Sequence, residues 1–193
     1  MRRYYLPDMI SLQEAMYQLS RLLSDQHSEL YSFLEYNGIT PVLYLTPWFL
    51  TIFASNFPLN FAVRVLGKFF HNKLSNQPIY LDMVIAEGPS AIFKFSLAIL
   101  LSKKDDMMKL EGFETVADYI KNHLNDIDDT LIRHLVATAS HIELNGSLDT
   151  YATEYSVLSE NDLLREPGQN WSPSKDIVRD LRNRSTFFLM YRL

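Results

Sequence analysis

The chain has no cysteine among its 193 residues. This absence excludes disulfides, thiolate nucleophiles and zinc sites with cysteine ligands. Positive charge is not in excess either, since 18 Lys and Arg against 23 Asp and Glu give a net charge of -5. A general nucleic-acid-binding surface is therefore disfavoured. The first residues contain no continuous apolar segment of the kind that forms a secretory signal, so we expect a cytosolic setting.

Charge is missing altogether from one long stretch. No Asp, Glu, Lys, Arg or His occurs from Tyr36 to Val63. Uncharged stretches of this length are typical either of a membrane span or of helices buried in a protein core. Three prolines interrupt this one, and its longest proline-free part, Trp48–Phe57, would rise only about 15 Å as a helix. We therefore predict short buried helices, with a membrane span as the weaker alternative.

The spacing of apolar residues predicts helices along the rest of the chain. The first helix is expected to begin near Ser11, which forms a capping-box pattern with Glu14. It should extend to about Glu35, with a break near residues 25–28. Thr46-Pro47 has the sequence of an N-cap followed by a first helical position, so a second helix is predicted to begin there.

Later segments continue the helical pattern. Pro58 is predicted to open a helix that extends through Arg64, and residues 90–101, with Lys94 as their only charge, are predicted to form a buried helix. Amphipathic helices are expected over about 113–124, 131–142 and 148–158. No segment alternates as a strand would. The predicted fold class is all-α, with about seven helices and an irregular C-terminal tail.

No residues have the spacing of a catalytic or metal-binding motif. His134 and His141 would lie about 10 Å apart on one helix, too far to bind the same zinc ion. The acidic pairs and triplets lack the spacing of a calcium loop and are interpreted as solvated helix ends; they are Asp105, Asp106, Asp126, Asp128 and Asp129. We predict no catalytic, cofactor-binding or metal-binding residue.

Residues that contact a partner are not identified by the sequence. Arg64 and Lys94 are cations within apolar segments and could reach a partner. The tail carries Lys175, Arg179, Arg182 and Arg184, which could touch acidic lipid or RNA. Because Asp176 and Asp180 alternate with these cations, a solvated face is the preferred interpretation.

Several stretches of the chain resemble the TBC-domain Rab GTPase-activating proteins, most closely the subgroup with phosphotyrosine-binding domains upstream. The W-F-L-T-x-F-A-S-x-F-P-L run of Trp48–Leu59 is the most specific of them. The resemblance implies an all-α domain without a cofactor that binds a GTP-loaded Rab, accelerates GTP hydrolysis and regulates vesicle traffic. It also implies a cytoplasmic location, peripheral on endomembranes. The matching stretches are 7–23, 43–59, 61–65, 81–101, 110–124 and 151–158.

The two catalytic motifs of that family are missing from this chain. The family supplies an arginine from I-x-x-D-x-x-R and a glutamine from Y-x-Q, and such an arginine is worth roughly 10³–10⁵ in rate. Here Tyr17 is followed directly by Gln18, and Asn183 stands where a pattern beginning at Ile177 would need arginine. The resemblance therefore implies a GTPase activator by family that is inactive alone. The alternative is a non-catalytic α-helical module that binds a Rab or another protein.

The resemblance also gives a domain organisation. Residues 7–124 are predicted to be the C-terminal half of a TBC domain, interrupted by an insertion at 66–80. Residues 125–160 would form the helices that follow the domain, and 161–193 an irregular or poorly ordered tail. Because half a domain leaves apolar surface uncovered, and each exposed large apolar side chain forfeits roughly 1.5–3 kcal/mol of burial, self-association through that surface is also expected.

Overall fold

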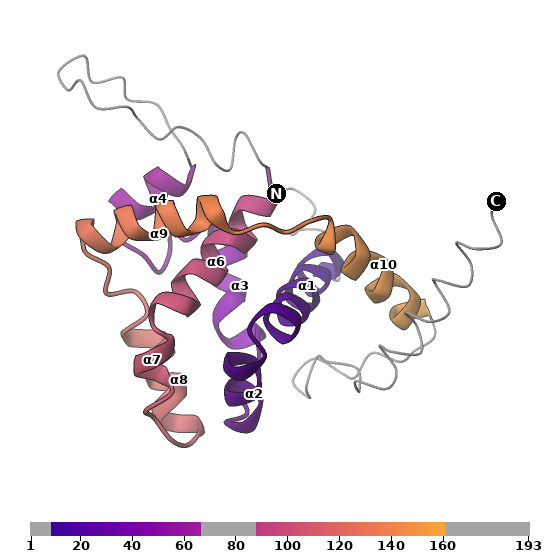
Figure 1. Cartoon of the computed structure of the whole chain (residues 1–193), viewed down its shortest axis with the longest axis horizontal. Coiled ribbons are helices and arrows are strands. Elements are labelled where there is room, and N and C mark those ends of the chain that lie inside the picture. Colours follow the sequence, from indigo (N-terminus) through magenta and orange to yellow (C-terminus); the bar gives the residue numbers. More distant parts are fainter. Residues whose placement is uncertain (1–8, 67–87, 161–193) are drawn as a thin grey trace, which may run out of the picture. The chain divides into compact units, whose positions relative to one another are not determined.

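The computed structural model describes residues 9–66 and 88–160 (Figure 1). Within these ranges there are nine helices and no strand, which confirms the all-α class. The predicted insertion beyond Leu66 and the predicted tail lie outside the described residues. The helices are α1 (Ile10–Gln26), α2 (Ser28–Tyr36), α3 (Val42–Thr51), α4 (Leu59–Leu66), α6 (Ser90–Ser102), α7 (Lys104–Met107), α8 (Phe113–Asn122), α9 (Asp129–His141) and α10 (Ser147–Glu160).

Two compact units divide these helices. The first unit comprises residues 1–12 and 43–143, and its described part contains α3, α4, α6, α7, α8 and α9. The second comprises residues 13–42 and 144–193, with most of α1, all of α2, and α10 in its described part. The predicted break in the first helix is confirmed, since α1 and α2 are separate helices on either side of His27. The short helix α7 was not predicted.

The core of the first unit is built from the uncharged stretch. Helix α6 is buried at nearly every position and packs chiefly against α9, with α4 and α7 also in contact. Phe53 lies among other aromatic rings at centroid distances of 5.5 to 6.5 Å, and its own side chain is fully buried. No helix in the described ranges has the length and apolar character to cross a bilayer. The prediction of buried helices is therefore confirmed. The rings around Phe53 are those of Trp48, Phe57, Phe61 and Phe95.

The predicted start of the second helix is wrong. Helix α3 begins at Val42, and Pro47 lies inside it. Tyr44 and Leu45, which precede the proline, are buried, so core packing holds the first turn in helical form. That packing offsets the backbone hydrogen bond that proline cannot donate.

Helix α3 also ends earlier than its apolar pattern suggests. It stops at Thr51, and Ile52 and Phe53 both have left-handed backbones, with φ of 49° and 64°. The Phe53 N–H donates to the Trp48 carbonyl at 3.1 Å, which closes the helix end with a six-residue turn. This corner reverses the chain and places the Phe53 ring in the core. Ile52, the first residue after α3, lies in this turn.

Local chemistry at Pro58 and Asp128 explains where α4 and α9 begin. The carbonyl of Pro58 accepts the first hydrogen bonds of α4, from Phe61 at 2.9 Å and Ala62 at 3.2 Å, which confirms the predicted opening. Asp128 is the N-cap of α9, where its carboxylate accepts the Leu131 N–H at 2.7 Å.

Candidate functional site

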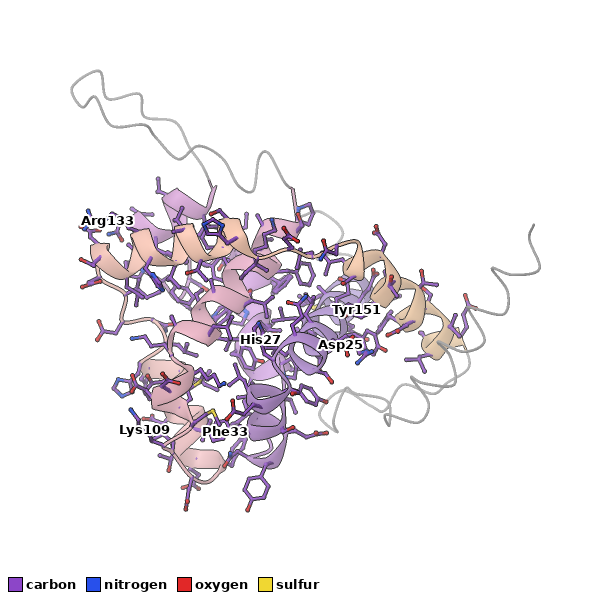
Figure 2. All side chains as sticks on the ribbon, in the orientation of Figure 1. Asp25, His27, Phe33, Lys109, Arg133 and Tyr151 are labelled. Carbon is purple, nitrogen blue, oxygen red and sulfur yellow. The ribbon has the colours of Figure 1, made fainter. Side chains whose placement is uncertain are left out.

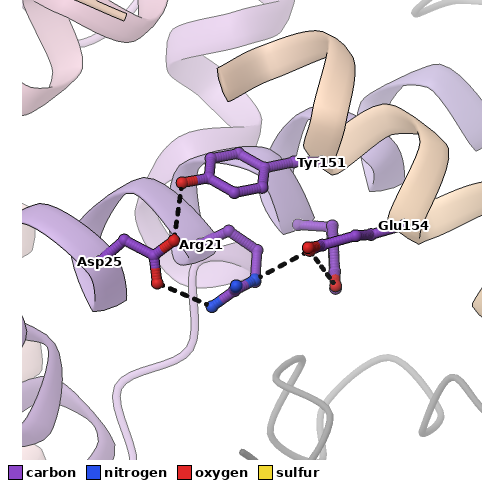
Figure 3. Close-up of polar contacts among 5 residues, drawn as sticks. Arg21, Asp25, Tyr151 and Glu154 are labelled. Atoms are coloured by element: carbon purple, nitrogen blue, oxygen red, sulfur yellow. Dashed lines mark hydrogen bonds and ion pairs between the residues drawn. The ribbon is translucent and has the colours of Figure 1, made fainter. Parts of the chain in front are cut away.

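A network of polar side chains joins α1 to α10 within the second unit (Figure 3). The Arg21 guanidinium donates from Nε to Glu154 Oε2 at 3.1 Å and pairs through Nη1 with Asp25 Oδ1 at 3.2 Å. Tyr17 donates its hydroxyl to the same Glu154 oxygen at 3.3 Å, and Tyr151 donates to Asp25 Oδ2 at 2.9 Å. The guanidinium carbon also lies 5.3 Å from the centre of the Tyr151 ring. Arg21 and Glu154 are thus paired although both are buried.

The surroundings of this network fix the protonation of its members. Burial, followed by the charge of Glu154, raises the pKa of Tyr17 well above its usual range. Burial and the hydrogen bond to Asp25 raise the pKa of Tyr151 to about 12. Burial alone would lower the pKa of Arg21, but Glu154 and Asp25 outweigh it, so that pKa is raised. Near neutral pH both phenols therefore stay protonated hydrogen-bond donors, and the network acts as a structural clamp.

Helices α4 and α9 of the first unit carry exposed apolar and charged side chains. Leu59 and Val63 lie four residues apart on α4 and are 75% and 40% exposed. Asn60, between them, donates to Asp129 of α9 at 2.8 Å and so links the two helices. Arg133, one turn further along α9, is exposed (Figure 2). We call Leu59, Asn60 and Val63 of α4, with Asp129 and Arg133 of α9, the α4–α9 face. Its exposed groups are two aliphatic side chains, the Asn60–Asp129 pair and the Arg133 guanidinium.

The residues singled out from the sequence are spread over the molecule. His134 and His141 are both exposed on α9. Among the described residues no three acidic or histidine side chains converge as metal ligands would. Lys94 is half-buried in α6, and Arg64 lies in α4. Lys175, Arg179, Arg182, Arg184, Ile177 and Asn183 lie outside the described residues.

The acidic residues lie at helix ends, as predicted. Asp105 and Asp106 are exposed in the first turn of α7, and Asp128 caps α9. The Arg21–Glu154 pair was missed by the sequence reasoning. Its signal is the position of Glu154, three residues after Tyr151 and four before Leu158, which puts a carboxylate on the buried face of α10. Trp48, Phe49 and Phe53, which belong to the uncharged stretch predicted to be buried, are core residues.

Comparison with known proteins identifies the family. The RabGAP TBC domain matches residues 1–151. The chain is 40% identical over 159 residues to TBC1 domain family member 4 of Mus musculus, a match that covers 82% of this chain and 11% of that protein. It is 33% identical over 161 residues to the GTPase-activating protein GYP5 of Eremothecium gossypii, with 83% and 17% covered.

A more distant relative extends the comparison. The Rab GTPase-activating protein eat-17 of Caenorhabditis elegans is 28% identical over 145 residues, covering 75% of this chain and 14% of that protein. The chain thus spans a small part of the length of these relatives. The matched region begins before α1, includes α3, α4, α6 and α9, and ends within α10. The chain therefore belongs to the RabGAP TBC domain family.

Proposed function

We propose that this chain is the part of a Rab GTPase-activating protein that binds a GTP-loaded Rab, in the regulation of vesicle traffic. The family match over residues 1–151 is the observation that supports this most strongly. The relatives GYP5 and eat-17 are named as GTPase-activating proteins. In this proposal the domain occupies residues 7–124 with its insertion at 66–80, and α9 and α10 belong to the segment that follows it. The protein works in the cytoplasm, peripherally on endomembranes.

The α4–α9 face is the part of the surface that we assign to the Rab. Protein interfaces commonly combine an apolar centre with arginine at or near it. Leu59 and Val63 supply exposed aliphatic surface on α4, and Arg133 supplies an exposed guanidinium on α9. The exposed Asn60–Asp129 hydrogen bond links α4 to α9 on this face, which supports treating the two helices as one surface.

The chemistry of activation needs groups that we do not find in this sequence. Neither I-x-x-D-x-x-R nor Y-x-Q occurs among its residues. Tyr17 is buried and bonded to Glu154, and the amide of Gln18 donates to the Leu148 carbonyl, so both side chains serve the α1–α10 contact. We propose that the chain alone binds without accelerating hydrolysis.

A single-turnover assay tests this part of the proposal. Rab proteins loaded with GTP would be mixed with the 193-residue chain, and phosphate release followed over time. We expect the intrinsic rate of each Rab to be unchanged, whereas a TBC protein that carries both motifs, used as the positive control, should accelerate its own Rab. An arginine finger raises the hydrolysis rate roughly 10³–10⁵-fold, so a chain without one should give no such acceleration. An acceleration of about tenfold or more by this chain would contradict the proposal.

The second candidate is a non-catalytic α-helical module that binds a protein other than a Rab. The same exposed face and the same missing motifs favour it. The two candidates differ in nucleotide dependence. If the partner is a Rab, the chain should bind its GTP-bound state more tightly than its GDP-bound state. If the partner is another protein, binding should not depend on added GTP or GDP.

A further inference from the structure

Two asparagine–glycine pairs occur in the sequence, Asn37–Gly38 and Asn145–Gly146. In such a pair the backbone nitrogen of the glycine can attack the side-chain amide carbon of the asparagine. Glycine has no Cβ to shield its nitrogen and its backbone is unusually free to rotate, so an asparagine followed by glycine is more reactive than one followed by a larger residue. Whether a given pair reacts in the folded chain depends on its exposure and on its hydrogen bonds.

The fold protects the first pair. Asn37 is only 8% exposed, and its Nδ2 donates to the Phe33 carbonyl at 2.9 Å. The attacking nitrogen of this pair is also engaged, because the Gly38 N–H donates to the Glu35 carbonyl at 3.0 Å. These bonds close the C-terminal end of α2. The side-chain amide and the glycine nitrogen can therefore react only when that end of the helix opens.

The second pair lacks this protection. Asn145 and Gly146 are both exposed, in the connection between α9 and α10. Neither the Asn145 amide nor the Gly146 N–H is hydrogen-bonded to another residue in the part of the chain that the structure describes. One backbone bond, from the Ser147 N–H to the Leu144 carbonyl at 2.7 Å, closes the turn around the pair. An exposed turn of this kind opens locally at little cost in free energy.

We propose that Asn145 is a site of spontaneous deamidation. The Gly146 nitrogen, after giving up its proton, attacks Cγ of Asn145 and forms a succinimide ring. The bond between Cγ and Nδ2 breaks as the ring closes, and the side-chain nitrogen takes up a proton and leaves as ammonia. Water then opens the ring at either of its carbonyl carbons. One opening gives aspartate, and the other gives isoaspartate, in which the main chain continues through Cγ.

Either product changes the connection that leads into α10. Both carry a carboxylate, which adds one negative charge to a chain whose net charge is -5. Isoaspartate also adds a methylene group to the backbone between Leu144 and Ser147, so the hydrogen bond that closes the turn is lost. The compact units divide between Glu143 and Leu144, and the modified residue therefore lies just after that division. The inference is independent of the proposed Rab contact, because the residues of the α4–α9 face are unchanged.

Peptide mapping of the folded chain tests the proposal. The full chain would be kept at mildly alkaline pH in oxygen-labelled water and then digested in mild acid in ordinary water, which limits deamidation during preparation. Ring opening incorporates oxygen from the surrounding water, so mass spectrometry separates reaction in the folded chain from later artefact. Electron-based fragmentation distinguishes aspartate from isoaspartate. We expect both products at position 145, formed at least about tenfold faster than those of Asn37 (about 1.4 kcal/mol).

The unfolded chain is the matched control. In guanidinium chloride the two pairs have the same exposure, so Asn37 and Asn145 should react at similar rates, which attributes the difference between them to the fold. A variant, Asn145→Gly, removes the reactive amide and keeps a residue that readily adopts the φ of 44° found there. Its mapped peptides should show no deamidation product at position 145 and the same slow reaction at Asn37. In the isoaspartate fraction of the unsubstituted chain, the Ser147 amide should exchange with solvent faster than before incubation.

Two results would overturn the proposal. One is a folded chain in which Asn145 stays intact over the period in which the unfolded chain loses both amides. The other is a folded chain in which Asn37 reacts as fast as Asn145, because the exposure of the second pair would then make no difference. Circular dichroism before and after the incubation checks that the helices are present throughout.

Discussion

Replacing Glu154 with alanine should destabilise the fold strongly. The substitution removes the carboxylate that accepts hydrogen bonds from Arg21 and Tyr17, and Arg21 is only 6% exposed. Removing one partner of a buried ion pair costs about 3–5 kcal/mol. Arg21 keeps Asp25 at 3.2 Å and the Tyr151 ring at 5.3 Å, so we expect a loss near the lower limit, about 3 kcal/mol. A domain has about 5–15 kcal/mol in total.

Urea unfolding followed by far-UV circular dichroism measures this loss. The midpoint should fall while the denaturant slope stays the same, as it does when stability alone changes. Glu160→Ala is the control, because Glu160 is exposed at the end of the same helix, and its effect should stay within about 0.5 kcal/mol. If Glu154→Ala costs no more than about 1 kcal/mol beyond that control, the network does not clamp α10 to α1.

The pairing itself can be separated from the burial. A double variant, Arg21→Met with Glu154→Leu, removes both charges and keeps apolar volume at the two positions. Replacing a buried ion pair with apolar side chains is often neutral or stabilising. We therefore expect the double variant to be more stable than Glu154→Ala. A double variant less stable than Glu154→Ala would contradict this expectation. It would show that the two charged groups make stabilising contacts besides their own ion pair.

Three further predictions concern backbone and protonation. Gly112→Ala should destabilise the protein by about 1–3 kcal/mol in thermal or urea unfolding, because φ of 85° and ψ of 150° suit glycine alone; Glu111→Ala next to it should be nearly neutral. Asp128→Ala should cost about 1 kcal/mol through loss of the α9 N-cap, whereas Asp126→Ala should not. Because the folded pKa of Tyr151 is raised to about 12 from 10, the unfolded chain releases that proton first. The contribution of the protonated Tyr151 phenol to the free energy of unfolding is therefore complete below about pH 10 and is lost towards pH 12. Tyr151→Phe should make stability fall less steeply over that interval, and an unchanged fall would contradict the raised pKa of Tyr151.

The composition of the sequence predicted the core and much of the fold. The uncharged stretch from Tyr36 to Val63 had to be buried or cross a membrane, and its prolines excluded one long helix. The nearly uncharged segment at 90–101 was recognisable as a central helix, which α6 is. The break at His27 and the opening at Pro58 were also predicted, because capping and proline effects act over a few residues.

Tertiary packing accounts for what the sequence reasoning missed. Pro47 has the local chemistry of a first helical position, yet burial of Tyr44 and Leu45 begins α3 earlier. The left-handed turn at Ile52 and Phe53 has no glycine to announce it and is held by the Phe53 ring in the aromatic core. Helix α7 is a single short turn of mostly charged residues, which has no apolar period to detect.

The candidate site was less predictable than the fold. The sequence alone showed that catalytic motifs were missing, but it gave no residues for partner binding. Leu59 and Val63 have the pattern of ordinary apolar helix residues, and only the packing of α4 shows that they are exposed. The Arg21–Glu154 pair joins residues 133 positions apart, a distance over which periodicity carries no information.

Binding to Rab proteins in defined nucleotide states is the most direct test of the account. The immobilised chain would be incubated with Rab proteins bound to a non-hydrolysable GTP analogue or to GDP, beside a Leu59→Asp variant. Phe113→Asp is the matched control, since Phe113 is 50% exposed on α8, away from the α4–α9 face. We expect retention of at least one Rab in the GTP-analogue state, reduced tenfold or more by Leu59→Asp (about 1.4 kcal/mol) and unaffected by Phe113→Asp. A folded chain that retains no Rab in either state, or retains it equally with Leu59→Asp, would contradict the assignment.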